Sequence, residues 1–306
     1  MMTEPSPNRP RDLDPQSVAR RYIAAIKEEL EQQQLDIHVI GFIASEDLPS
    51  LTYARATRQK FEEVGIHYTL KSVKRLDLEE EIIKANDDPD IDGIFIYFPI
   101  FQNEQDVYLR NLVDYRKDIE AGSLYWTRKL YANDRLAEPG RHDKKAVIPC
   151  TPLAILKMLT AAGIYNEDTK QPIAGKTVTI FNRSEVIGRP LAVMMSNDGG
   201  RVYSFDINGP MLFENAKPSE VTISRKEALS QSDIIITGVP NKHFPKICAR
   251  EIRPGTACVN FSTFANFSDD VETHTDIYIP RVGPMTVAMC MRNTLRLYTN
   301  FHIINQ

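Results

Sequence analysis

The chain has 306 residues, which is enough for two domains that each bury a core of their own. Its apolar fraction of 42% and charged fraction of 25% are typical of a soluble globular protein, and no apolar run approaches the length of a membrane span. The formal net charge of -4 gives no reason to expect a nucleic-acid or anionic-membrane partner.

The cysteines and the N-terminal segment indicate the compartment. The four cysteines are scattered, without CxxC spacing or a nearby histidine cluster, which argues against a disulfide framework or a metal site and for a reducing environment. The first fourteen residues are polar and proline-rich and lack the apolar core of a secretory signal. Their three acidic residues count against a mitochondrial presequence, although their arginines leave it open. We expect a flexible N-terminus and a cytoplasmic protein.

Strands and helices alternate through the first half of the chain, a rhythm that predicts a parallel sheet. Asp14 before Pro15 is a good N-cap with proline at the first helical position, and Gly65 is a typical helix stop. Helices are predicted over 15–34, 50–64, 78–86 and 106–113, and strands over 37–44, 68–73 and 93–98. A loop-rich stretch over 128–145 then closes a first domain, residues 1–150.

The second half of the chain repeats this pattern after a connecting helix over 152–163 and a polar hinge over 166–172. Strands are predicted over 176–181, 202–205, 233–237, 257–261 and 278–279. Residues 151–285 are therefore expected to form a Rossmann-like domain. Apolar residues at helical spacing over 286–304 predict a terminal helix, and residues 286–306 are expected to return to the first domain.

Residues 175–206 read as strand, phosphate-binding turn, helix and second strand. Such a unit places backbone N–H groups at a helix N-terminus, where a dinucleotide pyrophosphate would sit. Gly188 opens the helix, whereas Asn182 stands where a first glycine is usual. Asp206 follows about twenty residues later, where a carboxylate can accept both ribose hydroxyls and would repel a 2′-phosphate. The unit predicts NAD over NADP, with a ligand-free βαβ unit and a capping Asp206 as the alternative interpretation.

Three short segments occur in the order in which a known enzyme family carries them: PCTP at 149–152, NRSEVIGRP at 182–190 and VGPMTVAM at 282–289. Tyr53 on a helix, GIFIYFP at 93–99 and Lys117-Asp118 stand upstream. From about Pro15 to Arg296 the set resembles the methylenetetrahydrofolate dehydrogenase/cyclohydrolase family, and most of all its fungal cytosolic monofunctional NAD-dependent branch. The resemblance implies two α/β domains around a cleft, oxidation of 5,10-methylenetetrahydrofolate with NAD in one-carbon metabolism and purine biosynthesis, and a homodimer.

The chain also departs from the bifunctional members of that family. Thr57 stands where they carry the cyclohydrolase lysine, and Tyr97 replaces the glutamine that supports it. Glu120 replaces the aspartate that holds the pterin, and Pro280-Arg281 replaces a glycine pair. Hydride transfer needs no proton acceptor at the reacting carbon, whereas hydrolysis of the methenyl product needs an acid–base group. We therefore expect dehydrogenase activity without cyclohydrolase activity.

The resemblance also assigns the substrate site. Tyr53 would stack on the folate, Glu120 would accept hydrogen bonds from the pterin edge, and Cys150 would line the cleft; these three are the catalytic candidates. Their ordinary interpretations are a half-buried aromatic residue, a surface carboxylate and a small buried apolar residue. The predicted substrate contacts are Tyr53, Thr57, Tyr97, Phe98, Glu120, Pro280 and Val282.

The cofactor contacts are expected in the turns that follow the strands of the second domain, because ligands bind beyond the carboxyl ends of parallel strands. They are predicted as Arg183, Ser184, Glu185, Gly188, Asp206, Ile207, Gly238, Val239, Pro240, Phe261, Ser262 and Thr263. No metal site is expected.

Three rival hypotheses remain. A bifunctional enzyme would release 10-formyltetrahydrofolate well above the spontaneous rate. A catalytically silent NAD-binding regulatory protein would bind NAD and produce no NADH, and the degenerate glycine turn and Pro280-Arg281 are its best support. An NADP-linked dehydrogenase would gain nothing from Asp206→Ser.

Overall fold

The computed structural model describes residues 13–303, which divide into two compact units. The three-stranded unit comprises residues 20–150 and 287–303, and the seven-stranded unit comprises residues 13–19 and 151–286. Residues 13–19, which the sequence analysis assigned to the first domain, thus group with the second sheet. Most of the predicted flexible N-terminus and the predicted helix end at Ile304 lie outside the described residues.

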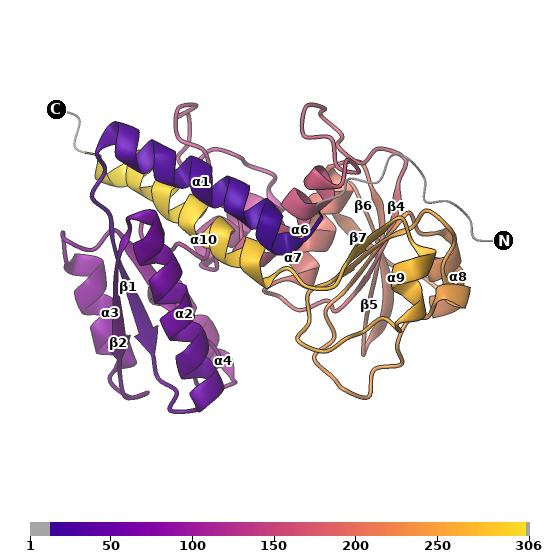
Figure 1. The fold of residues 1–306 in the computed structure, drawn as a ribbon, viewed down its shortest axis with the longest axis horizontal. Coiled ribbons are helices and arrows are strands. Elements are labelled where there is room, and N and C mark those ends of the chain that lie inside the picture. The colour runs from indigo at the N-terminus through magenta and orange to yellow at the C-terminus, as the bar shows by residue number, and fades with distance from the viewer. Residues whose placement is uncertain (1–12, 304–306) are drawn as a thin grey trace. The chain divides into compact units, whose positions relative to one another are not determined.

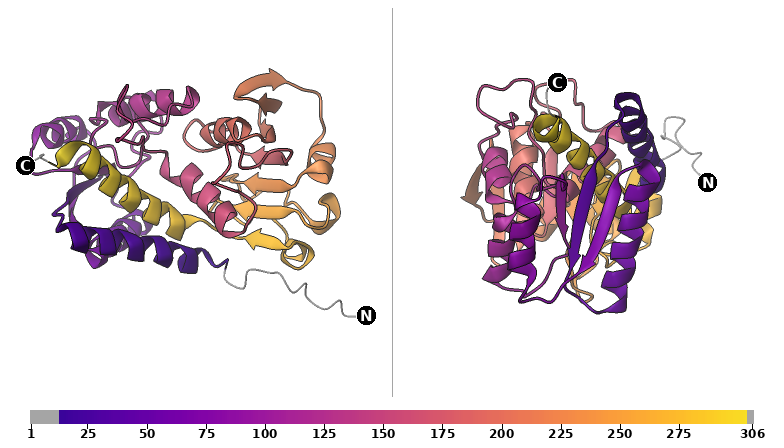
Figure 2. Two further views of the ribbon diagram at one scale, coloured as in Figure 1. Left: turned by 90° about the horizontal axis from the view of Figure 1, so that it is seen from above. Right: turned by 90° about the vertical axis from the view of Figure 1, so that its left-hand side faces the viewer.

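The three-stranded unit is built on a parallel sheet in the order β2-β1-β3. Its strands are β1 (His38–Ile43), β2 (His67–Ser72) and β3 (Gly93–Ile96), and its helices include α2 (Leu48–Val64), α3 (Leu78–Asp87) and α4 (Glu104–Leu112). The elements are labelled in Figure 1, and the right-hand view of Figure 2 shows helices α3 and α4 together on one side of this sheet and helix α2 on the other. Asp47 caps α2 by accepting the N–H of Ser50, and Gly65 ends it in the left-handed region. The sequence prediction of this layer is confirmed.

Helix α5 (Leu124–Tyr131) was not predicted, and its second half falls in the expected loop region. Its aromatic residues and its lack of a side-chain cap hydrogen bond give it little local helix signal. Tertiary packing supplies the stability instead. Trp126 is fully buried against the rings of Tyr115 and Tyr125, and its indole N–H donates to the carbonyl of Tyr115.

The seven-stranded unit has the strand order β10-β9-β8-β4-β5-β6-β7. Its parallel part comprises β4 (Thr177–Phe181), β5 (Arg201–Asp206), β8 (Ile234–Thr237), β9 (Ala257–Asn260) and β10 (Ile277–Ile279), which lie side by side in Figure 2. Its helices include α7 (Gly188–Asn197), α8 (Arg225–Gln231), α9 (Asp270–His274) and the short 3₁₀ turn Ala249–Glu251. The predicted Rossmann-like parallel sheet is confirmed.

An antiparallel hairpin, β6 (Gly209–Glu214) and β7 (Lys217–Glu220), extends this sheet and corrects the expectation of a purely parallel one. Asn215 and Ala216 both have positive φ, of 49° and 61°, as the two-residue turn of a tight hairpin requires. Because β7 is fully exposed and polar, it carries no hydrophobic alternation by which the sequence could reveal it.

Helix α10 (Gly283–Leu297) starts three residues before the predicted start and continues as a π-helical turn, Tyr298–His302. From residue 287 onwards this segment belongs to the three-stranded unit. Helices α1 (Pro15–Gln33) and α6 (Cys150–Ala161) begin and end close to their predicted bounds. Within residues 13–303, no helix combines the length and apolar character needed to cross a bilayer.

Candidate functional site

The substrate side of the site begins on α2. Thr57 is fully buried one turn after Tyr53, and its hydroxyl donates to the Tyr53 carbonyl at 3.0 Å. Tyr53 itself is 50% exposed, and its ring meets that of Tyr97 edge-on with 6.1 Å between the ring centres. An exposed aromatic face on a helix suits a stacking role. The Thr57 hydroxyl is already bonded to the backbone, and threonine has no amine that could exchange a proton near neutral pH.

Tyr97 directly follows β3 and is buried. Its hydroxyl lies 2.8 Å from the Tyr68 hydroxyl, and burial raises the pKa of Tyr97 to about 12. Both hydroxyls are therefore neutral at physiological pH. Tyr97 stands where the bifunctional relatives carry the glutamine that supports the cyclohydrolase lysine. Its neutral hydroxyl, paired with that of Tyr68, cannot act as a base there.

Glu120 is a partly buried carboxylate whose environment sets its acidity. Burial, with a smaller contribution from nearby Asp118, raises the pKa of Glu120 to about 8, while Arg110 and the backbone of Ile96 oppose the rise. The surface-carboxylate interpretation therefore does not describe it. A carboxylate that titrates near neutrality inside the fold is a functional-site candidate on physical grounds.

Arg110 is a residue that the sequence analysis missed. It extends from α4, and its guanidinium lies 5.0 Å from the centre of the Phe98 ring. A Cβ added to Gly122 would come 2.8 Å from Arg110 Cδ, so the glycine makes room for the arginine stem. Phe98, Glu120 and Arg110 thus gather from three separate segments, and no local motif marks the arginine.

Cys150 is buried at the start of α6, as its ordinary interpretation expects. Its sulfur lies 3.2 Å from the sulfur of Cys290 and 3.4 Å from the carbonyl oxygen of Ile119, the residue before Glu120. The hydrogen bond between the two thiols and their burial raise the pKa of Cys290 well above its usual range. Cys150 is therefore shielded from solvent and lies next to the loop that carries Glu120.

The Lys117-Asp118 pair of the family resemblance shapes the same loop. Lys117 Nζ donates to three backbone carbonyls at the end of α3, at 2.7–3.0 Å. Asp118 accepts the N–H of Ser123 at 2.7 Å, and burial raises its pKa. Both side chains form hydrogen bonds within the protein, which leaves Glu120 as the carboxylate of this loop that is available to a ligand.

In the seven-stranded unit, the turn after β4 shows how the phosphate-binding turn forms without its usual first glycine. Asn182 has a positive φ of 107°, a conformation that asparagine tolerates better than most residues, and its amide donates to the Gly238 carbonyl at 2.7 Å. A Cβ on Gly188 would lie 1.6 Å from the Asn182 carbonyl oxygen, so only glycine fits at the start of α7. The degenerate fingerprint preserves the close approach that the phosphate turn needs.

Asp206 ends β5, as predicted, and is tied to Arg183. Arg183 donates to Asp206 Oδ1 at 2.6 Å and to the carbonyls of Ser204 and Gly209. Asp206 Oδ1 also accepts the N–H of Asn208, so the capping interpretation is correct for that oxygen. Within residues 13–303, no hydrogen bond is assigned to Oδ2.

Arg183, a predicted cofactor contact, is buried, and its guanidinium is already bonded within the protein, so it is suited to hold Asp206 and not to donate directly to the cofactor. Ser184 and Glu185 are exposed in the turn, and the Ser184 hydroxyl lies 3.4 Å from the N–H groups that open α7. Ile207, another predicted cofactor contact, is fully exposed beside Asp206.

The remaining predicted cofactor turns are held together by two asparagines that the sequence analysis missed. Asn266 bonds both the N–H and the carbonyl of Val239, while Asn260 donates to the carbonyl of Pro280 at 3.1 Å. Ser262 Oγ donates to the Val239 carbonyl at 3.0 Å. The Phe261 ring occupies the space that a Cβ on Gly238 would need. Pro240 and Thr263 are exposed and Val282 is buried.

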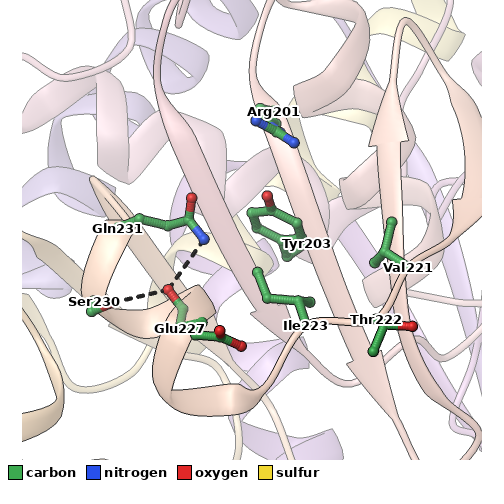
Figure 3. Close-up of a pocket in the computed structure, with 8 residues that line it drawn as sticks. All are labelled: Arg201, Tyr203, Val221, Thr222, Ile223, Glu227, Ser230 and Gln231. Atoms are coloured by element: carbon green, nitrogen blue, oxygen red, sulfur yellow. Dashed lines mark hydrogen bonds between the residues drawn. The ribbon is translucent and has the colours of Figure 1, made fainter.

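Two hollows lie apart from the predicted residues. One, of about 550 Å³, lies between β5, α8 and the segment that precedes α8, with Tyr203 and Ile223 among its lining residues (Figure 3). The other, of about 640 Å³, is in the three-stranded unit and includes His38, Asp92 and His302. No predicted site residue lines either one. Among the described residues, no group of three or more His, Cys, Asp or Glu could hold a metal ion.

Comparison with known protein families agrees with this arrangement. Residues 13–120 match the catalytic domain of the tetrahydrofolate dehydrogenase/cyclohydrolase family, and residues 149–302 match its NAD(P)-binding domain. The chain belongs to the tetrahydrofolate dehydrogenase/cyclohydrolase family.

Its curated relatives include methylenetetrahydrofolate dehydrogenase [NAD(+)] of Dictyostelium discoideum, 38% identical over 301 residues and 96% of both chains. The enzyme of the same name from Saccharomyces cerevisiae is 38% identical over 87% of both chains. A solved structure of the NAD-dependent 5,10-methylenetetrahydrofolate dehydrogenase from that yeast superposes with a TM-score of 0.88, at 35% identity over 95% of this chain and 98% of that one. The bifunctional protein FolD of Latilactobacillus sakei is only 25% identical, over 88% of this chain and 90% of its own.

Proposed function

We propose that this chain oxidises 5,10-methylenetetrahydrofolate to 5,10-methenyltetrahydrofolate with NAD and does not hydrolyse the product. The observation that carries the proposal is buried Thr57, bonded to the Tyr53 carbonyl, in a site that keeps Tyr53 and Glu120. The relatives that share 36–38% identity are named as NAD-dependent methylenetetrahydrofolate dehydrogenases.

The substrate residues fit a positioning role. Tyr53 offers an exposed aromatic face on which the folate can stack, and Glu120 offers a shielded carboxylate for the amino-pyrimidinone edge of the pterin. With the methylene bridge closed, the lone pairs of the two flanking folate nitrogens can expel a hydride from the bridging carbon, which leaves the cyclic cation of the methenyl product. The protein's task is to hold two planar groups face to face at near-attack distance.

The cofactor residues fit NAD. Asp206 Oδ2, the oxygen without an assigned partner in the described chain, can accept the hydroxyls of an adenosine ribose, with Ile207 exposed beside it. Arg183 would fix the Asp206 carboxylate in the orientation that meets those hydroxyls. When bound, NAD supplies the hydride acceptor.

The loss of the cyclohydrolase step follows from which side chains near the substrate site can exchange a proton near neutral pH. Attack of water on the methenyl carbon requires a group that accepts or donates a proton near neutral pH. Thr57 does not ionise in this range, and the hydroxyl of Tyr97, with its pKa of about 12, remains protonated. Glu120 does titrate near neutrality, but it is assigned to the pterin edge.

We further propose that the enzyme acts as a homodimer in the cytoplasm and supplies one-carbon units for purine biosynthesis. These points rest on the family resemblance and, for the compartment, on the four cysteines, which are all free thiols. Sedimentation of the purified protein at several concentrations tests the dimer, and cell fractionation tests the compartment.

The decay of purified methenyltetrahydrofolate, with and without the protein, tests the loss of hydrolysis. We expect decay at the spontaneous rate with the protein present at catalytic concentration. Formation of 10-formyltetrahydrofolate well above that rate would establish the bifunctional alternative and defeat the argument from Thr57.

A further inference from the structure

The side chain of Asn293 on α10 is fully buried and bridges two loops of the three-stranded unit. Its amide nitrogen lies 2.9 Å from the carbonyl oxygen of Ile148, 3.1 Å from that of Ile119 and 3.4 Å from the sulfur of Cys150. Its Oδ1 is buried and has no hydrogen-bond partner among the described residues. An apolar residue would leave no such unpaired oxygen, so the amide group itself calls for an explanation.

The contacts of Asn293 converge on the peptide that carries Glu120. The Ile119 carbonyl accepts from the Asn293 amide and also from the Cys150 thiol, and the Asn293 amide contacts that same sulfur. Two donors therefore fix the orientation of the Ile119–Glu120 peptide plane. Because the Glu120 side chain follows directly on this peptide plane, the Asn293 amide is placed to influence where the Glu120 carboxylate lies.

We propose that Asn293 is a positioning residue for substrate oxidation. By bonding the carbonyls of Ile119 and Ile148, it fixes the loop that carries Glu120 relative to the loop that leads to Cys150. This inference rests on the proposed function, in which Glu120 binds the pterin edge. A misplacement of about 1 Å at a reacting complex costs about 100-fold in rate, so loss of this bridge should be visible in the kinetics.

Asn300 supplies a matched control. It lies seven residues further along the same C-terminal segment, is also buried, and its amide donates to a single loop carbonyl, that of Lys145, at 2.9 Å. It makes the same kind of bond without an assigned contact to the Glu120 loop. Removing it should cost stability in a similar way without changing the site.

The test compares Asn293→Leu, Asn293→Asp and Asn300→Leu with the wild-type enzyme. Leucine keeps the bulk and removes both polar atoms, while aspartate keeps the shape but replaces the donating amide group with a carboxyl oxygen. We expect both Asn293 variants to raise KM or lower kcat for methylenetetrahydrofolate by about 10- to 100-fold. The dissociation constant for NAD should remain within about twofold of wild type in all three variants.

A second readout does not depend on activity. Carbon NMR of glutamate-labelled protein without ligands measures the pKa of the Glu120 carboxyl directly, with Glu120→Gln to assign its signal. We expect Asn293→Leu to shift that pKa and Asn300→Leu to leave it in place. Wild-type kinetics together with a wild-type Glu120 pKa in Asn293→Leu would overturn the inference. A shifted pKa in a protein that never oxidises the folate would defeat only the proposed function.

Discussion

The two units place their key carboxylates in different electrostatic settings. In the three-stranded unit, Glu120 is partly buried beside a second, buried carboxylate, and burial raises its pKa to about 8. In the seven-stranded unit, Asp206 ends a strand with its side chain 23% exposed, an arginine bonded to one oxygen and the fully exposed Ile207 next to it. One carboxylate is tuned by burial and the other is held by direct bonds.

The difference follows from what each carboxylate must recognise. Glu120 is proposed to meet a planar heterocycle whose donors form strong bonds only when water is excluded. Asp206 is proposed to meet ribose hydroxyls at the mouth of a turn, where geometry and charge discriminate against a phosphate. Substitutions at the two sites should therefore differ in their dependence on pH and on cofactor.

The largest expected effect is that of Glu120→Gln. The amide keeps the shape but loses the charge and half of the acceptor capacity. Because a hydrogen bond to a charged group is worth about 1.5–3 kcal/mol, we expect kcat/KM for the folate to fall about 100-fold. Steady-state kinetics with saturating NAD measures it. Glu138→Gln, which alters a carboxylate paired with Lys144 in the same unit, should leave kcat/KM within about twofold. A similarly small loss for Glu120→Gln would remove Glu120 from the site.

Asp206→Ser tests the other side of the comparison. It removes the charge that would repel a 2′-phosphate and releases the Arg183 guanidinium, so we expect the ratio of NADP to NAD use to rise about 10- to 100-fold. The ratio of the two kcat/KM values measures it.

The double variant Asp206→Ser, Arg183→Met serves as its control and should lose most of the gain in NADP use. An unchanged cofactor ratio in the single variant would contradict the assignment of Asp206.

The pH profile gives a smaller, diagnostic effect. The carboxylate form of Glu120 is the form that binds the pterin, so kcat/KM should rise with pH with a midpoint near 8 and level off roughly one pH unit higher. Arg110 lowers the pKa of Glu120, and Arg110→Met should move the midpoint upward and cost about threefold to tenfold at pH 7. Arg116→Met, which removes an arginine beside the Tyr115 ring, is the matched control and should not move the midpoint. A downward shift in Arg110→Met would contradict this electrostatic account.

The last prediction concerns stability. The pKa of Glu120 is raised from 4.5 in the unfolded chain to about 8 in the folded one, so the folded state binds the proton more tightly. Its contribution to stability is fully present below pH 4.5 and is lost as the pH rises to about 8. The Tm of Glu120→Gln relative to wild type should therefore increase by roughly 5–10 °C between pH 5 and pH 8. A constant difference across this range would show that burial does not shift the pKa.

The regular layers could be predicted from the sequence because their signals are local. Alternating strands and helices, the Asp14 cap and the Gly65 stop all appear in the structure close to their predicted places. Helix α5 and the β6–β7 hairpin escaped prediction because burial of Trp126 stabilises the first and an exposed polar edge strand forms half of the second. Neither feature produces hydrophobic periodicity.

The site divides in the same way. The family resemblance identified Tyr53 and Glu120, while Asp206 was predicted from its place at the end of the second strand of the dinucleotide-binding unit. Arg110 and Asn293 reach the Glu120 loop from distant helices, and only the folded chain brings them together. The positive φ of Asn182 likewise shows how a turn can keep its geometry after losing a glycine, which a fingerprint search treats as a defect.

The most direct test of the account is a spectrophotometric assay of 5,10-methylenetetrahydrofolate oxidation by the purified protein, with NAD and NADP compared side by side. The account predicts steady formation of NADH, with kcat/KM for NAD at least about tenfold above that for NADP. Binding of NAD without formation of NADH would contradict the enzymatic function, and equal or better use of NADP would contradict the role of Asp206.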